Sequence, residues 1–258
     1  MVTLALDNVS VRLGQRPVLH DISATFASGA LIGVIGPNGA GKSTLIRALV
    51  GLLPLAGGHV ALDGESIATV RRDVLARAIA YLPQGQTLHW PLTVERLVAL
   101  GRLPHLAPFS RIGDADHAAI ERAMALADVK GFATRTATEL SGGERARVLL
   151  ARALAVDAPI LIADEPLAAL DPEHQLQVMG LLSGQAAAGR LVIAVMHDLN
   201  VAMRFCHRLL LIADGRLADD GPPERVLTPE NLRNVYKITA WTGAVEGQRL
   251  IVPLHRTH

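Results

Sequence analysis

The sequence lacks most features that would indicate a secreted, membrane-spanning or nucleic-acid-binding chain. Its single cysteine, Cys206, excludes an intrachain disulfide and is compatible with a reducing compartment. The N-terminus shows no basic segment followed by a long apolar one, so we expect no secretion signal. No apolar run approaches the roughly 20 residues of a membrane span. A formal net charge of +1 gives no argument for nucleic acid as a partner.

What remains is a chain of 258 residues with 50% hydrophobic content, enough to bury a sizeable core. This length fits one large α/β unit, or one core with a smaller lobe. Alternating apolar and polar residues over 3–13 predict antiparallel strands at the start of the chain. Between about 88 and 137 apolar residues recur at helical spacing instead, so we expect helices there, from Val94, Leu97, Val98, Ile120, Met124 and Leu126.

A glycine-rich run lies between the apolar stretch 31–35 and a helix-like pattern. Its residues are Gly36, Pro37, Asn38, Gly39, Ala40, Gly41, Lys42, Ser43 and Thr44. This order of strand, glycine loop and helix is the context that a nucleotide-binding P-loop requires. Glycines let successive backbone N–H groups turn inward around an anion, and the start of the next helix adds the positive end of its dipole. The run therefore predicts that the chain binds a nucleoside triphosphate.

Two side chains of the run suit a triphosphate and its cation. Lys42 supplies a point charge to the β and γ phosphates, and the Ser43 hydroxyl is a ligand for Mg²⁺, a hard cation that prefers oxygen. P-loops occur among kinases, GTPases, helicases and transport ATPases. The run alone does not choose among these classes.

Two further patterns narrow the choice. The sequence Leu-Ser-Gly-Gly-Glu at 140–144 precedes an apolar-periodic segment, so Ser141 is placed to cap a helix and Glu144 to complete a capping box. By itself this pattern indicates only a good helix start. Further along, an apolar stretch predicts a buried parallel strand that ends in Asp164 and Glu165. An acidic pair after a strand can also be a helix cap at a strand-to-helix turn.

In their order and spacing, the P-loop, the LSGGE pattern and the ILIADEP stretch at 160–166 resemble the nucleotide-binding subunits of ABC transporters. Three segments extend the resemblance over nearly the whole chain: 81–84 is similar to the family's Q-loop, 167–171 to its D-loop and 196–198 to its switch histidine. The resemblance implies an α/β fold, a P-loop NTPase core with a mostly parallel sheet, an N-terminal antiparallel β subdomain and an inserted helical subdomain. It implies a single ABC ATPase domain over 1–258, with 1–87 and 138–258 as the β and P-loop core and about 88–137 as the helical subdomain.

The same resemblance assigns roles to residues. ATP and Mg²⁺ are the implied cofactors, with ATP held by Gly36, Asn38, Gly39, Ala40, Gly41, Lys42, Ser43 and Thr44. Asp164 would hold Mg²⁺ with Ser43 and Gln84. The implied catalytic residues are Glu165, which would orient the attacking water, His197, which would hydrogen-bond the γ-phosphate, and Gln84, which would report the nucleotide state to a partner. Because neighbouring strand residues face opposite ways, we expect the two carboxylates to point to different sides.

Ser141, Gly142 and Gly143 have no obvious partner within their own subunit. In the family these residues complete the ATP site of the other subunit, so the resemblance implies a head-to-tail homodimer with two composite sites.

One position departs from the family pattern. Many members stack an aromatic ring on adenine from the segment that here is 11–16, where this chain has Leu13. Leucine offers dispersion without ring stacking, and Arg16 is either an additional contact to the base or simply solvated.

Three further segments bear on which cargo the transporter would carry. Segments 92–105, 197–200 and 214–232 are similar to subunits that serve iron-siderophore, haem and cobalamin uptake, although a shared scaffold would also explain them. A zinc or manganese importer is the nearest alternative. The resemblance further implies transmembrane permease subunits, a cargo-binding protein and a place on the cytoplasmic face of the inner (plasma) membrane.

Two functions of other classes are disfavoured. A soluble ABC ATPase that works on DNA or ribosomes usually carries two ATPase halves or a long coiled coil, and this sequence has neither. An inert nucleotide-binding scaffold would lack some of the expected catalytic residues, and here every one is present.

Overall fold

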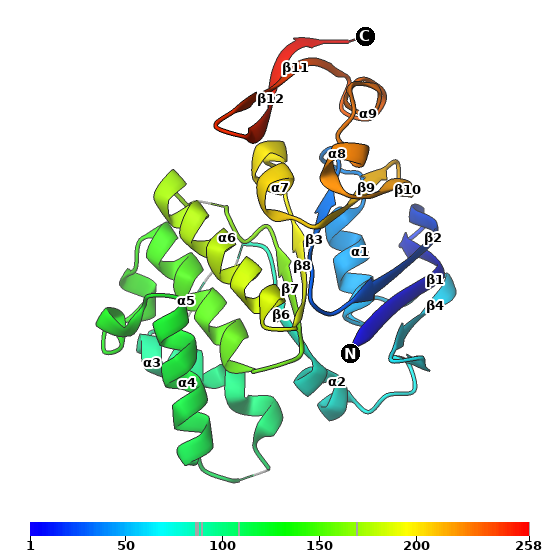
Figure 1. Cartoon of the computed structure of the whole chain (residues 1–258). Helices are drawn as coiled ribbons and strands as arrows, with labels where there is room; N and C mark the ends of the chain where they lie inside the picture. Colours follow the sequence, from blue (N-terminus) through cyan, green and yellow to red (C-terminus); the bar gives the residue numbers. More distant parts are fainter. Residues whose placement is uncertain (86–87, 89, 108, 169, 258) are drawn as a thin grey trace.

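The computed structural model describes residues 1–85, 88, 90–107, 109–168 and 170–257. Two large sheets, a group of helices beside them and a C-terminal hairpin make up this part of the chain (Figure 1). The domain ranges predicted from the sequence (1–87, about 88–137 and 138–258) contain positions 86, 87, 89, 108, 169 and 258, which lie outside the described residues.

A mostly parallel six-stranded sheet lies at the centre of the molecule, in the order β10-β9-β3-β8-β7-β6. Its strands are β3 (Leu31–Ile35), β6 (Ile79–Leu82), β7 (Ile160–Asp164), β8 (Leu191–Val195), β9 (Arg208–Ala213) and β10 (Arg216–Gly221). Strands β3, β7 and β8 are buried over their whole length, because both faces of the sheet are covered. Within β3, Ile32 and Val34 face one hydrophobic core while Leu31 and Ile35 face the other.

The first core lies between this sheet and an antiparallel one of order β2-β1-β4-β5. The antiparallel strands are β1 (Thr3–Leu13), β2 (Arg16–Ala27), β4 (Gly57–Leu62) and β5 (Glu65–Ser66). In β1 the buried side chains are Leu4, Leu6, Val9 and Val11, two alternating pairs that are separated by a register irregularity between Leu6 and Val9. Helix α1 (Lys42–Leu49) packs into the same core, and α2 (Arg72–Ala78) precedes β6.

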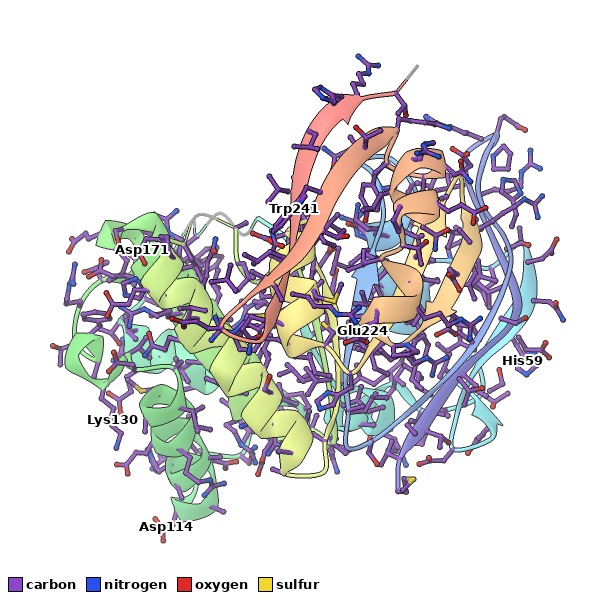
Figure 2. The ribbon with its side chains drawn as sticks, turned by 45° about the horizontal axis from the view of Figure 1, so that its top comes forward. His59, Asp114, Lys130, Asp171, Glu224 and Trp241 are labelled. Atoms are coloured by element: carbon purple, nitrogen blue, oxygen red, sulfur yellow. The ribbon has the colours of Figure 1, made fainter. Side chains whose placement is uncertain are left out.

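The second core lies on the opposite face, under α5 (Gly142–Ala155), α6 (Pro172–Ala187) and α7 (Leu199–Phe205). Against α5 pack α3 (Val94–Ala99), η1 (Leu100–His105) and α4 (Asp114–Leu126). Together with the turns η2 (Lys130–Phe132) and η3 (Ala137–Glu139), we call these elements the helical lobe. Figure 2 shows Asp114 and Lys130 of this lobe on the side of the molecule away from His59 of β4. The expected fold class is confirmed, whereas the subdomain boundary near 137 stays a prediction.

Arg102 fastens the helical lobe to the end of α5. Its side chain is 9% exposed, and Nε donates to Asp116 Oδ1 at 2.8 Å while Nη1 donates to the carbonyl oxygen of Ala155 at 2.8 Å. Next to it, a Cβ on Gly101 would lie 2.3 Å from the carbonyl oxygen of Arg152, so only glycine allows this approach. His105 Nε2 lies 2.7 Å from the carbonyl oxygen of Val156. Segment 92–105, which is similar to subunits for iron-siderophore, haem and cobalamin uptake, therefore contains side chains that connect the helical lobe to α5.

Arg102→Ala is expected to lower the free energy of unfolding by about 3 kcal/mol. The substitution removes one partner of a largely buried ion pair and leaves the Asp116 carboxylate without its cation. Urea unfolding followed by circular dichroism measures this change. Arg122→Ala is the matched control, since Arg122 pairs with Asp157 at 3.4 Å while its side chain is 61% exposed. The control is expected to cost less than about 1 kcal/mol. Equal losses in the two variants would contradict the role given to Arg102.

The C-terminal part was not predicted as a hairpin. After α8 (Pro223–Val226) and α9 (Pro229–Asn234), strands β11 (Ile238–Val245) and β12 (Gln248–Arg256) pair with each other (Figure 1). The side chain of Asn200 joins this hairpin to α7, because its Oδ1 accepts from the Ile251 N–H at 2.7 Å and its Nδ2 donates to the Ile251 carbonyl oxygen at 3.2 Å. No helix within the described ranges is long and apolar enough to cross a membrane.

Candidate nucleotide-binding site

The glycine run forms the loop that joins β3 to α1, as predicted. Gly36, Gly39 and Gly41 have φ values of +147°, +80° and +104°, in the region that favours glycine. A Cβ on Gly36 would lie 2.1 Å from the carbonyl oxygen of Ile212, so the loop also passes too close to β9 for a side chain. Helix α1 begins at Lys42 and carries no acidic residue in its first turn. Its N-terminus is therefore open to an anion.

Lys42 is the buried cation of this loop. It is 5% exposed, and its Nζ donates to the carbonyl oxygens of Gly36 and Pro37 at 2.9 and 3.0 Å. Burial lowers the pKa of the ammonium group, and the carboxylates of Glu165 and Asp164 oppose that shift. The ammonium group is thus held by backbone oxygens at the place where a phosphate would meet it.

Asp164 ends β7 directly beside the start of α1. The Ser43 hydroxyl donates to Asp164 Oδ1 at 3.1 Å, although the two residues are 121 positions apart. Asp164 is 1% exposed, and its Oδ2 is buried without a hydrogen-bond partner among the described residues. Burial raises the pKa of this carboxyl, and the hydrogen bond from Ser43 opposes the rise. Mg²⁺ prefers oxygen ligands, and the Ser43 hydroxyl and the unpartnered Asp164 Oδ2 are two such oxygens. These residues therefore fit that ion.

Glu165, Gln84 and His197 come together at the carboxyl ends of three neighbouring strands. Gln84, after β6, donates from Nε2 to Glu165 Oε2 at 2.6 Å, and His197 Nε2, after β8, lies 2.5 Å from Glu165 Oε1. Glu165 itself lies one residue beyond β7 with a φ of +55°. Its side chain is therefore turned away from Asp164 by a left-handed backbone position and not by the alternation of a strand. Both carboxylate oxygens are held by neighbouring side chains.

These residues line one cleft of about 960 Å³. Its lining comprises Leu13, Arg16, Val18, Asn38, Gly39, Gly41, Lys42, Ser43, Thr44, Gln84, Glu165 and His197. Of the other P-loop residues, Ala40 packs into the core beneath the antiparallel sheet and Gly36 lies against β9. Asp164 lies beneath the cleft, beside Ser43.

Residues of the antiparallel sheet also line the cleft, beside the P-loop. Leu13 ends β1 and is 47% exposed, and Arg16 begins β2, so both extend from one hairpin. The sequence singled out these two residues but missed Val18, which lines the same part of the cleft. Val18 lies between Pro17 and Leu19 at an irregularity of the β1–β2 register, which no local pattern of the sequence indicates. This part of the cleft offers aliphatic surface and one cation to a nucleotide base.

The LSGGE residues at 140–144 form the start of α5 and do not line this cleft. Ser141 caps α5: its Oγ accepts from the Glu144 N–H at 3.3 Å, and Glu144 Oε2 accepts from the Ser141 N–H at 2.8 Å, so the predicted capping box is present. Neither Ser141 nor Gly143 lines the cleft, and Gly142 lines a separate cavity of about 330 Å³ together with Asp164 and Glu165. One chain therefore does not bring these three residues to its own P-loop.

The segment similar to a D-loop follows Glu165. Ala169 within it lies outside the described residues. Asp171, at the start of α6 (Figure 2), accepts the His174 N–H through Oδ1 at 2.9 Å and so caps that helix.

The fold and the cleft define a P-loop nucleotide-binding protein. A family profile described as ABC transporter matches residues 19–168. The chain is 41% identical to the cobalamin import ATP-binding protein BtuD of Halobacterium salinarum, over 98% of this chain but only 64% of that longer protein. It is 42% identical to the hemin import ATP-binding protein HmuV of Streptomyces coelicolor, over 99% of this chain and 91% of that one. The chain belongs to the ABC transporter family.

Solved structures agree with this fold. A chain of an inward-facing transporter assigned to the metal-chelate type of ABC transporters superposes with a TM-score of 0.85 at 24% identity, covering 99% of this chain and 98% of that one. A dimeric bacterial ABC transporter cassette gives a TM-score of 0.76 at 28% identity, covering 85% of this chain and 98% of that one. The core architecture is therefore that of ABC cassettes.

Proposed function

We propose that this chain is the ATP-hydrolysing subunit of an ABC importer for a metal chelate, namely an iron-siderophore, haem or cobalamin. The observation that carries the proposal is the geometry around Glu165. Gln84 and His197 hold both of its carboxylate oxygens at 2.6 and 2.5 Å, beside the P-loop that carries Lys42 and Ser43. A fixed carboxylate next to a phosphate cradle is what hydrolysis of a phosphoanhydride by water needs.

The chain's own residues divide the work of binding. The backbone and side chains of Gly36, Asn38, Gly39, Ala40, Gly41, Lys42, Ser43 and Thr44 would hold the phosphates of ATP. Asp164, Ser43 and Gln84 would hold Mg²⁺, and the unpartnered Oδ2 of Asp164 supports that placement. When bound, Mg²⁺ supplies charge neutralisation to the phosphates.

Hydrolysis then depends on two residues beside the γ-phosphate. Glu165 would orient a water and accept its proton at a carboxylate oxygen. His197, which faces Glu165 in this structure, would hydrogen-bond the γ-phosphate as negative charge develops on it. Gln84 would transmit the state of the site to a partner, since it lies in the sequence between β6 and the first helix of the helical lobe.

The site would be completed by a second copy of the chain. Ser141, Gly142 and Gly143 do not line the cleft of their own chain among the described residues, and Ser141 and Gly142 are exposed at the start of α5. In a head-to-tail homodimer, these residues would cap the γ-phosphate bound by the partner's P-loop. A dimeric cassette among the structural neighbours supports this arrangement.

The importer assignment rests on the relatives named for cobalamin and hemin import. We infer permease subunits, a separate cargo-binding protein and a peripheral position on the cytoplasmic face of the inner (plasma) membrane, with no nucleic acid as partner. Residues 1–87 and 138–258 would form the core and about 88–137 the helical subdomain. The alternatives are a zinc or manganese importer and a soluble ABC ATPase without a transport role.

Uptake by the cells of origin tests the cargo class. Cells that carry the Glu165→Gln chain in place of the native one are expected to lose uptake of a labelled iron-siderophore, haem or cobalamin, while uptake of Zn²⁺ and Mn²⁺ continues. Loss of Zn²⁺ or Mn²⁺ uptake with intact uptake of all three chelates would favour the rival importer. Unchanged uptake of every cargo would contradict a role in transport.

A further inference from the structure

Glu144 has two oxygens, and only one of them belongs to the helix cap. Its Oε2 accepts the Ser141 N–H at 2.8 Å, while Oε1 accepts from Arg135 Nη1 at 2.8 Å. The pKa of Glu144 is lowered from 4.5 to about 2, first by the Ser141 backbone and then by Arg135. The carboxylate is therefore ionised at neutral pH, and its orientation depends on both neighbours.

Arg135 is itself fixed on two sides. Its guanidinium carbon lies 5.1 Å from the centre of the Phe132 ring, and Arg147 lies 5.6 Å from the same ring. Its backbone N–H donates to the Phe132 carbonyl oxygen at 2.9 Å. A guanidinium that rests on a ring and shares a carboxylate has little freedom to turn, so it fixes the second oxygen of Glu144.

The backbone of Arg135 connects this arrangement to the chain that follows Gln84. The Arg135 carbonyl oxygen accepts from the Val94 N–H at 3.0 Å, at the first residue of α3. Around it, the Ala137 N–H donates to the Leu92 carbonyl oxygen at 2.8 Å and the Glu95 N–H to the Ala133 carbonyl oxygen at 3.0 Å. One residue thus touches both the segment after Gln84 and the start of α5.

We propose that Arg135 is a positioning residue of the composite ATP site: acting through Glu144, it orients the turn at 141–143 that caps the γ-phosphate on the partner subunit. This inference rests on the proposed dimer. The Arg135 and Glu144 side chains are 43% and 22% exposed, so their ion pair contributes little to folding stability. Its effect falls on the orientation of the turn.

The test compares two equilibria in the full-length Glu165→Gln chain, which accumulates the ATP-bound state. Sedimentation velocity with ATP measures dimerisation, and titration of dilute chain with a fluorescent ATP analogue measures binding to the P-loop. Arg135→Gln is expected to weaken dimerisation roughly tenfold, the effect of losing about one charge-assisted hydrogen bond between the misoriented turn at 141–143 and the partner's γ-phosphate. Nucleotide affinity of the dilute chain is expected to stay unchanged within about twofold, because the turn at 141–143 does not line that chain's cleft.

Two controls make the comparison specific. Arg122→Gln makes the same chemical change in the same lobe, at an exposed pair with Asp157, and is expected to alter neither equilibrium. Combining Arg135→Gln with Glu144→Gln is expected to weaken dimerisation no further than the stronger single change, because both disrupt one contact. Thermal unfolding of Arg135→Gln is expected within about 4 °C of the parent, which shows that the variant folds.

Native dimerisation of Arg135→Gln would overturn the inference, and so would equal losses in dimerisation and nucleotide binding, or additive effects in the double variant. Failure of the Glu165→Gln parent itself to dimerise with ATP would overturn the proposed dimer and this inference with it. That result is distinct from normal dimerisation of both parent and variant, which overturns the role of Arg135 alone.

Discussion

Glu165→Gln is expected to slow ATP hydrolysis by roughly 10²-fold or more, because a positioned base contributes 10² to 10⁴ in rate. Glutamine has nearly the same shape, so the contacts to Gln84 and His197 can be kept in part, but it cannot accept the proton of a water. The P-loop and Lys42 are untouched, so ATP affinity is expected to stay close to native. Phosphate release under single-turnover conditions measures the rate, and equilibrium titration measures the affinity.

The matched control for that change is Glu121→Gln on α4, which replaces an exposed glutamate on the helical lobe. It is expected to hydrolyse ATP at the native rate. If Glu165→Gln also turned over at the native rate, Glu165 would not be the base. If it lost ATP affinity instead, the carboxylate would be part of the binding site only.

Lys42→Ala is expected to weaken ATP binding by roughly 10²-fold, the loss of about two charge-assisted hydrogen bonds to phosphate oxygens. Lys42 is the buried cation of the loop, and alanine leaves nothing in its place. Lys130→Ala provides the control, because Lys130 is an exposed lysine of the helical lobe (Figure 2) and lies outside the cleft. Titration calorimetry with ATP and Mg²⁺ separates the two. Native affinity of Lys42→Ala would show that the backbone of the loop binds the phosphates without it.

Parts of the site that are local in sequence could be predicted well. A P-loop is one contiguous segment, so its strand, glycines and helix start define the geometry without help from distant residues. The capping box of Ser141 and Glu144 is local in the same way, and the structure contains it. The meeting of Ser43 with Asp164 is not local, yet parallel strands with their carboxyl ends at one edge made it predictable once the family resemblance was recognised.

Features that depend on tertiary contacts were missed. The C-terminal hairpin has no strong alternation of its own, and Asn200 of α7 holds it through the backbone of Ile251. The direction of Glu165 was expected to follow from strand alternation, but a φ of +55° sets it. The contacts of Arg102 with Asp116 and with the end of α5 also depend on packing, which no local pattern encodes.

The contact between Arg135 and Glu144 could not be predicted from the sequence either. Glu144 could be recognised as a capping residue from its spacing to Ser141, but its second oxygen is bound by a residue nine positions earlier, in an irregular segment. Only the folded lobe brings the guanidinium there.

Mixing two inactive variants shows whether two chains build each ATP site. Lys42→Ala disables the P-loop of its own chain, and Gly142→Asp places a negative charge where the partner's γ-phosphate would lie. Each homodimer then has two defective sites, whereas the heterodimer combines both defects in one site and leaves the other intact. We predict that ATP hydrolysis, absent from either chain alone, returns on mixing. Capture of one variant by an affinity tag on the other, in the presence of ATP, shows that heterodimers form. A mixture that forms heterodimers by this measure yet stays as inactive as its components would contradict the composite site.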